Sequence, residues 1–101
     1  MVDLLKELSL LFKTGKVVYG NKEVINVLYH GKVLGVIVAS KIPKEIFDKV
    51  TYYCKISGIP YYVFDGTSAE LGKLCGKPFM ISSIAILNQG ESNILELFKN
   101  E

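Results

Sequence analysis

A short apolar run ends at Gly20, and the polar residues Asn21, Lys22 and Glu23 follow it at once. A glycine at such a junction lets the backbone turn sharply and approach a ligand closely. We expect Asn21 to cap the helix that follows, so that free backbone N–H groups and the lysine ammonium point outward together. This combination predicts a binding site for an anion, above all for a phosphate group.

Two further loops carry residues of related chemistry. Ser40 and Lys41 follow another apolar run with a hydroxyl and a cation, and the segment before the last expected strand contains Lys77, Pro78, Phe79 and Met80. Cations and aromatic rings on rigid loops are what unpaired or irregular RNA requires of a protein. Each loop alone is more simply a surface turn with solvated lysines, but the coincidence of the three favours a binding site.

The environment of Phe79 distinguishes these two interpretations. In a plain turn the ring packs into the core like other aromatic side chains. In a binding loop Pro78 stiffens the backbone and Phe79 presents an exposed face for stacking. The sequence alone leaves both possibilities open.

The elements that must position these loops alternate along the chain. Strands are expected over residues 16–19, 34–39, 61–64 and 82–87. Helices are expected from Asp3 to Thr14-Gly15 and over residues 22–29, 44–57, 68–75 and 91–99, with Thr67 and Glu70 spaced as a capping box. The alternation predicts an α/β fold, a three-layer α/β/α sandwich around a small, mostly four-stranded mixed sheet.

In such folds the connections that leave the carboxyl ends of the strands usually bind the ligand. The loops at residues 20–23 and 39–43 leave such ends. Residues 76–81 lead into the last strand, so they must fold to the same edge to join the other two. We therefore expect all three loops at one edge of the sheet.

The composition limits the possible functions. The 101 residues are enough for one domain, residues 1–101, with one hydrophobic core. A net charge of +2 means that any nucleic-acid binding has to come from local clustering. All twelve cationic residues are lysines, so the guanidinium that commonly reads guanine is absent, and we expect backbone contacts and recognition of shape.

Several kinds of site are not expected. Cys54 and Cys75 lie on apolar helical stripes and are predicted to be buried free thiols in a reducing cytoplasm. No zinc-site spacing, membrane-length apolar run or evident acid/base pair is found, so we expect no metal, no cofactor, no membrane and no enzymatic activity. A small nucleotide- or phosphometabolite-binding enzyme that uses Gly20 to Lys22 stays an alternative, as does a protein-interaction module.

Short blocks of sequence, taken in order and with their spacing, carry a resemblance over nearly the full chain. On them the chain resembles the L-thirty-e family of archaeal and eukaryotic large-subunit ribosomal proteins, within the L-seven-Ae superfamily of kink-turn RNA binders. The blocks are Thr14-Gly15-Lys16 with Gly20, Val36 to Ala39, Tyr52-Tyr53 with Ser57-Gly58-Ile59-Pro60, Glu70-Leu71-Gly72, Gly76-Lys77-Pro78-Phe79 and Gly90 to Leu95.

The resemblance implies a non-enzymatic α/β/α sandwich that binds a kink-turn, a sharply bent RNA motif, through loops at one edge. By position, Gly20, Asn21 and Lys22 would meet the kinked backbone and its G·A pairs. Ser40 and Lys41 would flank them. The loop residues that would pack on unstacked bases are Lys77, Phe79 and Met80.

The same resemblance implies a cytoplasmic constituent of the large ribosomal subunit. Its partners would be ribosomal RNA and neighbouring ribosomal proteins, and the free chain would be a monomer. The wider superfamily favours Gly-x-Asn-Glu with a lysine three residues after the glutamate. Here Lys22 takes the asparagine place, Glu23 is retained and Asn26 stands where the lysine would be. This pattern fits the ribosomal branch better than the proteins of guide-RNA particles, which stay an alternative.

Overall fold

The computed structural model describes residues 4–30 and 32–98. Asp3 and Lys99, where two expected helix boundaries fall, lie outside them, as does Gly31. The elements in chain order are α1 (Leu4–Thr14), β1 (Lys16–Tyr19), α2 (Asn21–His30), β2 (Gly35–Lys41), α3 (Lys44–Ser57), β3 (Tyr61–Thr67), α4 (Ser68–Leu74), β4 (Ser83–Asn88) and the 3-10 helix η1 (Ile94–Phe98).

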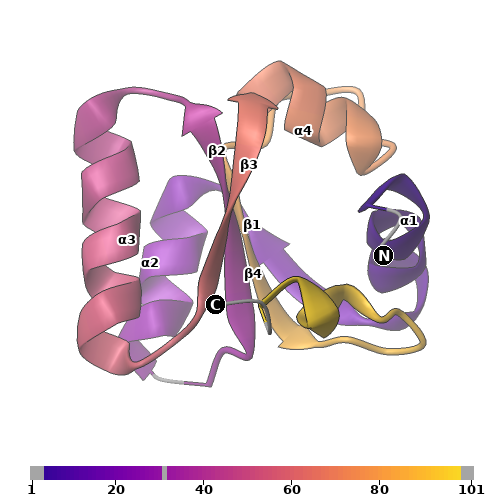
Figure 1. Cartoon of the computed structure of the whole chain (residues 1–101), viewed down its shortest axis with the longest axis horizontal. Coiled ribbons are helices and arrows are strands. Elements are labelled where there is room, and N and C mark those ends of the chain that lie inside the picture. The colour runs from indigo at the N-terminus through magenta and orange to yellow at the C-terminus, as the bar shows by residue number, and fades with distance from the viewer. Residues whose placement is uncertain (1–3, 31, 99–101) are drawn as a thin grey trace.

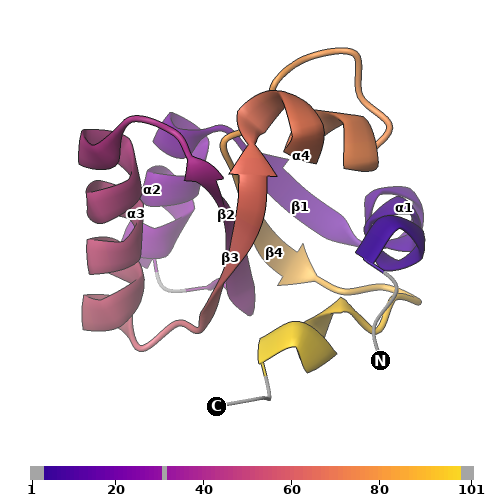
Figure 2. The same ribbon diagram turned by 45° about the horizontal axis from the view of Figure 1, so that its top comes forward.

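The described strands form one mixed sheet in the order β1-β4-β2-β3. β4 is antiparallel to both β1 and β2, whereas β2 and β3 are parallel. Helices α2 and α3 cover one face of this sheet, and α1, α4 and η1 cover the other (Figures 1 and 2). The predicted three-layer α/β/α architecture is confirmed.

Strand β2 explains why both faces need a helical layer. Its side chains alternate between the faces, since successive residues of a strand point in opposite directions. Ile37 packs with α1 and α4, while Val36 and Val38 pack with α2 and α3, and all three are fully buried. A continuous apolar run of this kind is typical of a strand covered on both sides.

Local sequence signals set the bounds of α3 and α4. Helix α3 ends where Gly58 adopts a left-handed conformation (φ 69°), and the N–H group of Ile59 bonds back to the carbonyl of Cys54 at 2.9 Å. At the start of α4, the Thr67 hydroxyl accepts from the Glu70 N–H at 3.1 Å, and the Glu70 carboxylate accepts from the Thr67 N–H at 2.8 Å. The predicted capping box is confirmed.

The expected last helix over residues 91–99 is wrong. Within the described residues only the 3-10 helix η1 (Ile94–Phe98) forms there. The preceding N–H groups are held by α1 instead: Thr14 accepts from Glu91 N–H at 2.9 Å, and the Glu7 carboxylate accepts from Asn93 N–H at 2.6 Å. These long-range hydrogen bonds occupy backbone N–H groups at the position where an α-helix was expected to start.

Both cysteines are buried and free, as predicted. Cys54 belongs to the core under α2 and α3, and Cys75 to the core under α1 and α4. Burial raises the pKa of each thiol to about 12, and nearby Lys77 opposes this slightly at Cys75. Each thiol therefore acts as a small apolar side chain in its core.

We expect Cys54 and Cys75 to resist iodoacetamide in the folded chain at about pH 8 and to react fully in guanidinium chloride, because the thiolate is the nucleophile. Ionised thiols are favoured in the unfolded chain. Their contribution to the free energy of unfolding is therefore complete below pH 9.0 and falls as the pH rises toward about 12. Mass spectrometry of the alkylated chain counts the modified cysteines, and rapid modification in native buffer would contradict the expected protection.

Candidate functional site

The sheet register brings the three predicted loops to one edge. Because β4 is antiparallel to its neighbours, its first residues lie beside the last residues of β1 and β2. Gly20 N–H donates to the Ser83 carbonyl at 3.0 Å, and Ala39 N–H donates to the Ser82 carbonyl at 2.9 Å. Residues 76–81, which lead directly into Ser82 and Ser83, therefore join this edge, as the sequence predicted.

Gly20 forms the turn from β1 into α2. It has a φ of 97°, in the region that favours glycine, and its carbonyl accepts the first helical hydrogen bond from Val24 N–H at 2.9 Å. The N-cap position therefore belongs to Gly20, and the expectation that Asn21 holds it is wrong. The backbone turns at Gly20, so Asn21 is already the first residue of the helix. The side chain of Asn21 lies outside what the structure describes.

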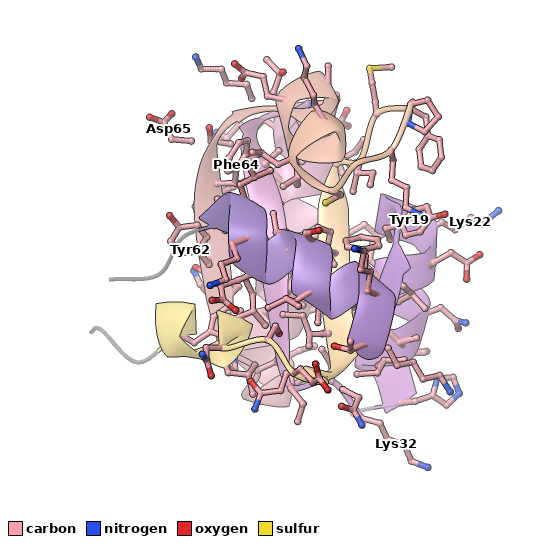
Figure 3. All side chains as sticks on the ribbon, turned by 90° about the vertical axis from the view of Figure 1, so that its right-hand side faces the viewer. Tyr19, Lys22, Lys32, Tyr62, Phe64 and Asp65 are labelled. Atoms are coloured by element: carbon pink, nitrogen blue, oxygen red, sulfur yellow. The ribbon has the colours of Figure 1, made fainter. Side chains whose placement is uncertain are left out.

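Lys22 and Glu23 are both exposed in the first turn of α2. Figure 3 shows Tyr19 and Lys22 close together on the right of the molecule, well above Lys32 at its lower end. Lys22 also lines a hollow of about 540 Å³ between α2 and α3, together with Ile25, Glu45, Ile46 and Lys49. Lys22 thus belongs to the same first turn as the unpartnered N–H groups that open α2.

Phe79 lies at the surface, stacked on another ring. Its side chain is 45% exposed, and its ring lies 5.6 Å from that of Tyr19 at an interplanar angle of 29°. Met80 is 70% exposed, and Pro78 is exposed as well. The loop therefore presents an aromatic face at the surface instead of burying it in the core.

Tyr19 and Phe12, which sequence reasoning missed, extend this contact. Phe12 of α1 lies 6.0 Å from Tyr19, and the Nζ atom of Lys77 lies 5.4 Å from the centre of the Phe12 ring. A signal was present in the strand pattern, since Val17 and Tyr19 share the face that packs toward α1. Lys77, half-buried, is already engaged by a cation–π contact.

Ser40 and Lys41 occupy the β3 side of the edge. The Ser40 hydroxyl accepts a hydrogen bond from Gly66 N–H at 3.2 Å and so links β2 to β3. Lys41 lies opposite Thr67 in the register of these two strands. The hydrogen bonds from Thr67 hold the pKa of Glu70 below its usual range, and the Lys41 charge adds to them. Lys41 is exposed, whereas the Ser40 hydroxyl is half-buried and structural.

The loop backbone rests on α4 at a glycine. A Cβ atom at Gly72 would overlap the carbonyl oxygen of Phe79, and Lys77 N–H donates to the Gly72 carbonyl at 3.0 Å. Gly76 has a φ of 76° and ends α4 in the manner of a Schellman motif. The chain can fold back over α4 only because residue 72 has no side chain.

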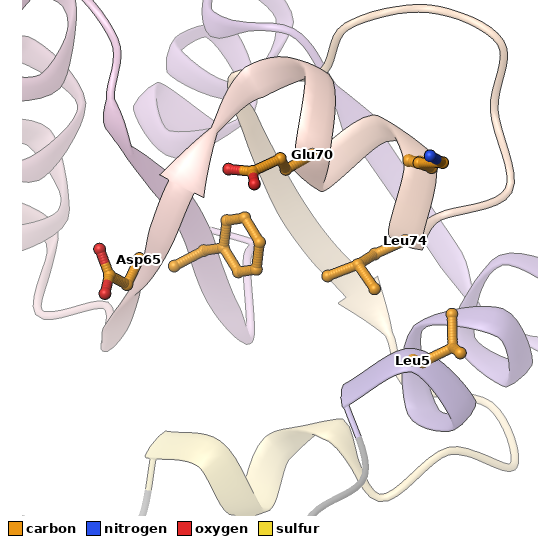
Figure 4. Close-up of a pocket in the computed structure, with 6 residues that line it drawn as sticks. Leu5, Asp65, Glu70 and Leu74 are labelled. Atoms are coloured by element: carbon orange, nitrogen blue, oxygen red, sulfur yellow. The ribbon is translucent and has the colours of Figure 1, made fainter.

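A hollow of about 510 Å³ lies apart from these loops, between α4, the end of β3 and the start of α1. Figure 4 shows Leu5, Asp65, Glu70 and Leu74 around it, and none of the predicted binding residues lines it. Within the described residues no cluster of side chains suited to a metal ion is found, and no helix is long and apolar enough to cross a membrane.

Comparison with known proteins now identifies the chain. The model of the Ribosomal protein L7Ae/L30e/S12e/Gadd45 family matches residues 3–96. The chain belongs to this family. The family resemblance inferred from the short sequence blocks is thus confirmed.

Individual family relatives agree. The chain is 50% identical over 93 residues to "Large ribosomal subunit protein eL30" of Sulfurisphaera tokodaii, which covers 92% of this chain and 88% of the relative. It is 41% identical over 100 residues to the protein of the same name from Methanocaldococcus jannaschii, which covers 99% of this chain and 91% of the relative. These relatives are named as ribosomal proteins and not as enzymes, so the expectation of a non-enzymatic chain is confirmed on that ground.

A solved structure supports the fold of this L7Ae/L30e family member. The structure of a protein with unknown function from Bacillus halodurans superposes with a TM-score of 0.82. It is 24% identical and covers 99% of this chain and 100% of its own. At this level of identity the likeness concerns the fold alone.

We expect Gly72→Ala to destabilise the chain by about 1–3 kcal/mol, because the added methyl group would push the Phe79 backbone off α4. Equilibrium urea unfolding measures the change. At an exposed helical position, replacement of glycine by alanine would instead stabilise by about 1 kcal/mol. A gain in stability for Gly72→Ala would therefore contradict the contact between residue 72 and the Phe79 backbone. Lys73→Ala, at the neighbouring exposed position, should change the stability by less than about 0.5 kcal/mol.

Proposed function

We propose that this chain is a structural constituent of the large ribosomal subunit and binds a kink-turn in ribosomal RNA by its shape. The observation that carries the proposal is the exposed Phe79 ring, which shares one preformed edge with the start of α2 and with Lys22. Relatives that cover nearly the whole chain are named as large ribosomal subunit proteins, which supports the ribosomal role.

The start of α2 suits the RNA backbone. The first N–H groups of a helix have no partner within the helix, and the helix dipole adds a partial positive charge there. Gly20 leaves the approach open, since nothing lies within 4 Å of where its Cβ atom would be. Phosphates of a sharply bent strand would meet these N–H groups and the Lys22 ammonium, while Asn21 and Glu23 would face the G·A pairs beside the kink.

The loop before β4 suits the unpaired bases of the kink. An exposed ring can stack on a flipped-out base, and such stacking is typically worth about 1–3 kcal/mol per base. Pro78 and Met80 flank Phe79 and are exposed with it. Lys77 would contribute its charge from the side of this loop, and Lys41 would meet the backbone at the other end of the edge.

The absence of arginine is consistent with recognition of the RNA by its shape. With lysines alone, the chain lacks the planar fork that recognises guanine in a regular helix. A preformed edge that accepts only a bent backbone supplies specificity in another way. On this proposal the chain acts in the cytoplasm within the ribosome, is a monomer before assembly, and contacts neighbouring ribosomal proteins there.

A titration tests the proposal directly. We expect the wild-type chain to bind a short kink-turn RNA at least tenfold more tightly than a matched duplex without the bulge and the G·A pairs, at each of two salt concentrations. Fluorescence anisotropy of labelled RNA measures both affinities. Equal, weak and salt-sensitive binding to the two RNAs would refute shape recognition and favour a generic basic edge.

Lys22→Ala should weaken kink-turn binding and lower the slope of log affinity against log salt by about one unit, as expected for the loss of one phosphate contact. Lys32→Ala is the matched control, because Lys32 is exposed beyond the other end of α2, away from Lys22 (Figure 3). An unchanged slope for Lys22→Ala, or an equal loss for Lys32→Ala, would remove Lys22 from the interface.

A further inference from the structure

We propose that Tyr19 is the positioning residue of the RNA-binding edge: its ring stacks on Phe79 and holds that ring ready to receive an unpaired base. This inference rests on the proposed function and deepens it. It assigns a role to a residue that neither the sequence motifs nor the family match singled out.

The backbone around Phe79 is held, but these contacts do not orient its side chain. Lys77 N–H bonds to the Gly72 carbonyl and Ile81 N–H bonds to the Ser68 carbonyl, each at 3.0 Å. These bonds anchor both ends of the turn against α4. Among the described residues, Tyr19 is the aromatic ring that stacks on Phe79.

Tyr19 itself is well placed to act as a fixed support. It is the last residue of β1, in register with Ile84 of β4, and the N–H group of the next residue, Gly20, bonds to Ser83. The Phe12 ring also lies 6.0 Å from the Tyr19 ring, and the Nζ atom of Lys77 lies over the Phe12 ring. Tyr19 therefore has two ring neighbours, and the three rings come from α1, β1 and the loop before β4.

The physical effect of this support is preorganisation. A half-exposed phenylalanine on a turn samples several rotamers, and a base that stacks on it must first select one of them. Stacking on a rigid neighbour makes that selection before the RNA arrives. A tilted or stacked aromatic pair contributes enough to shift binding about three- to tenfold.

A double-mutant cycle tests the inference with kink-turn RNA as the probe. Tyr19→Ala should weaken binding about three- to tenfold, and Tyr19→Phe should keep wild-type affinity because the ring alone provides the support. Phe79→Ala should weaken binding more. In the Phe79→Ala background, Tyr19→Ala should cost nothing further, since there is no ring left to position.

Other outcomes overturn the inference. If Tyr19→Ala leaves affinity unchanged, the stack has no role in binding. If its cost is the same with and without Phe79, or if Tyr19→Phe loses affinity, then Tyr19 contacts RNA itself and does not act through Phe79. If Phe79→Ala is harmless, Tyr19 has nothing to position.

Two controls separate these results from unrelated failures. Circular dichroism and thermal unfolding of each variant report whether the fold is intact, and Tyr19→Leu keeps most of the buried volume without an aromatic ring should Tyr19→Ala fail to fold. A wild-type chain that does not prefer the kink-turn over the duplex refutes the proposed function. A wild-type chain that prefers it, with additive Tyr19 and Phe79 variants, refutes this inference alone.

Discussion

The pairing of β4 between β1 and β2 decides where everything else in this molecule can lie. Antiparallel hydrogen bonds on both sides of β4 turn its first residues toward the carboxyl ends of its neighbours. The loop with Phe79 therefore meets the turn at Gly20 although almost sixty residues separate them in the chain. Had β4 run parallel to β1 and β2, the aromatic loop would have emerged at the opposite edge.

The edge has two parts with different chemistry. On the side of β1, Tyr19 and Phe79 present apolar ring faces next to the start of α2. On the side of β3, Ser40 and Thr67 use their polar atoms within the protein, and Lys41 is left as the exposed cation. On the proposed function, the rings of the first part would meet bases beside the phosphate-binding start of α2, and Lys41 of the second part would meet the backbone. The proposed recognition by shape would require both parts at a fixed separation, which the hydrogen-bonded sheet between them maintains.

Local signals predicted most of the fold. Pro43 and Gly58 directly precede and follow α3, so they predict both of its ends. Each sets a helix boundary through its own backbone conformation, which does not depend on distant contacts. Long-range contacts account for the failures. Thr14 and Glu7 of α1 hold the segment that was expected to begin the last helix. The candidate loops were found by composition, but the stacking of Phe79 on Tyr19 depends on strand order, which no single window of sequence contains.

The central place of the last strand also bears on how the chain folds. Lys16 pairs with Asn88, so the ladder that closes the sheet joins two segments that lie far apart in the sequence. Until β4 emerges, β1 and β2 have no partner on their facing edges, and unpaired edges of this kind are prone to wrong pairing. Pairing of such distant segments carries a large loop-closure entropy and is slow compared with helix formation. The sheet can therefore be completed only after β4 has left the ribosome that makes the chain.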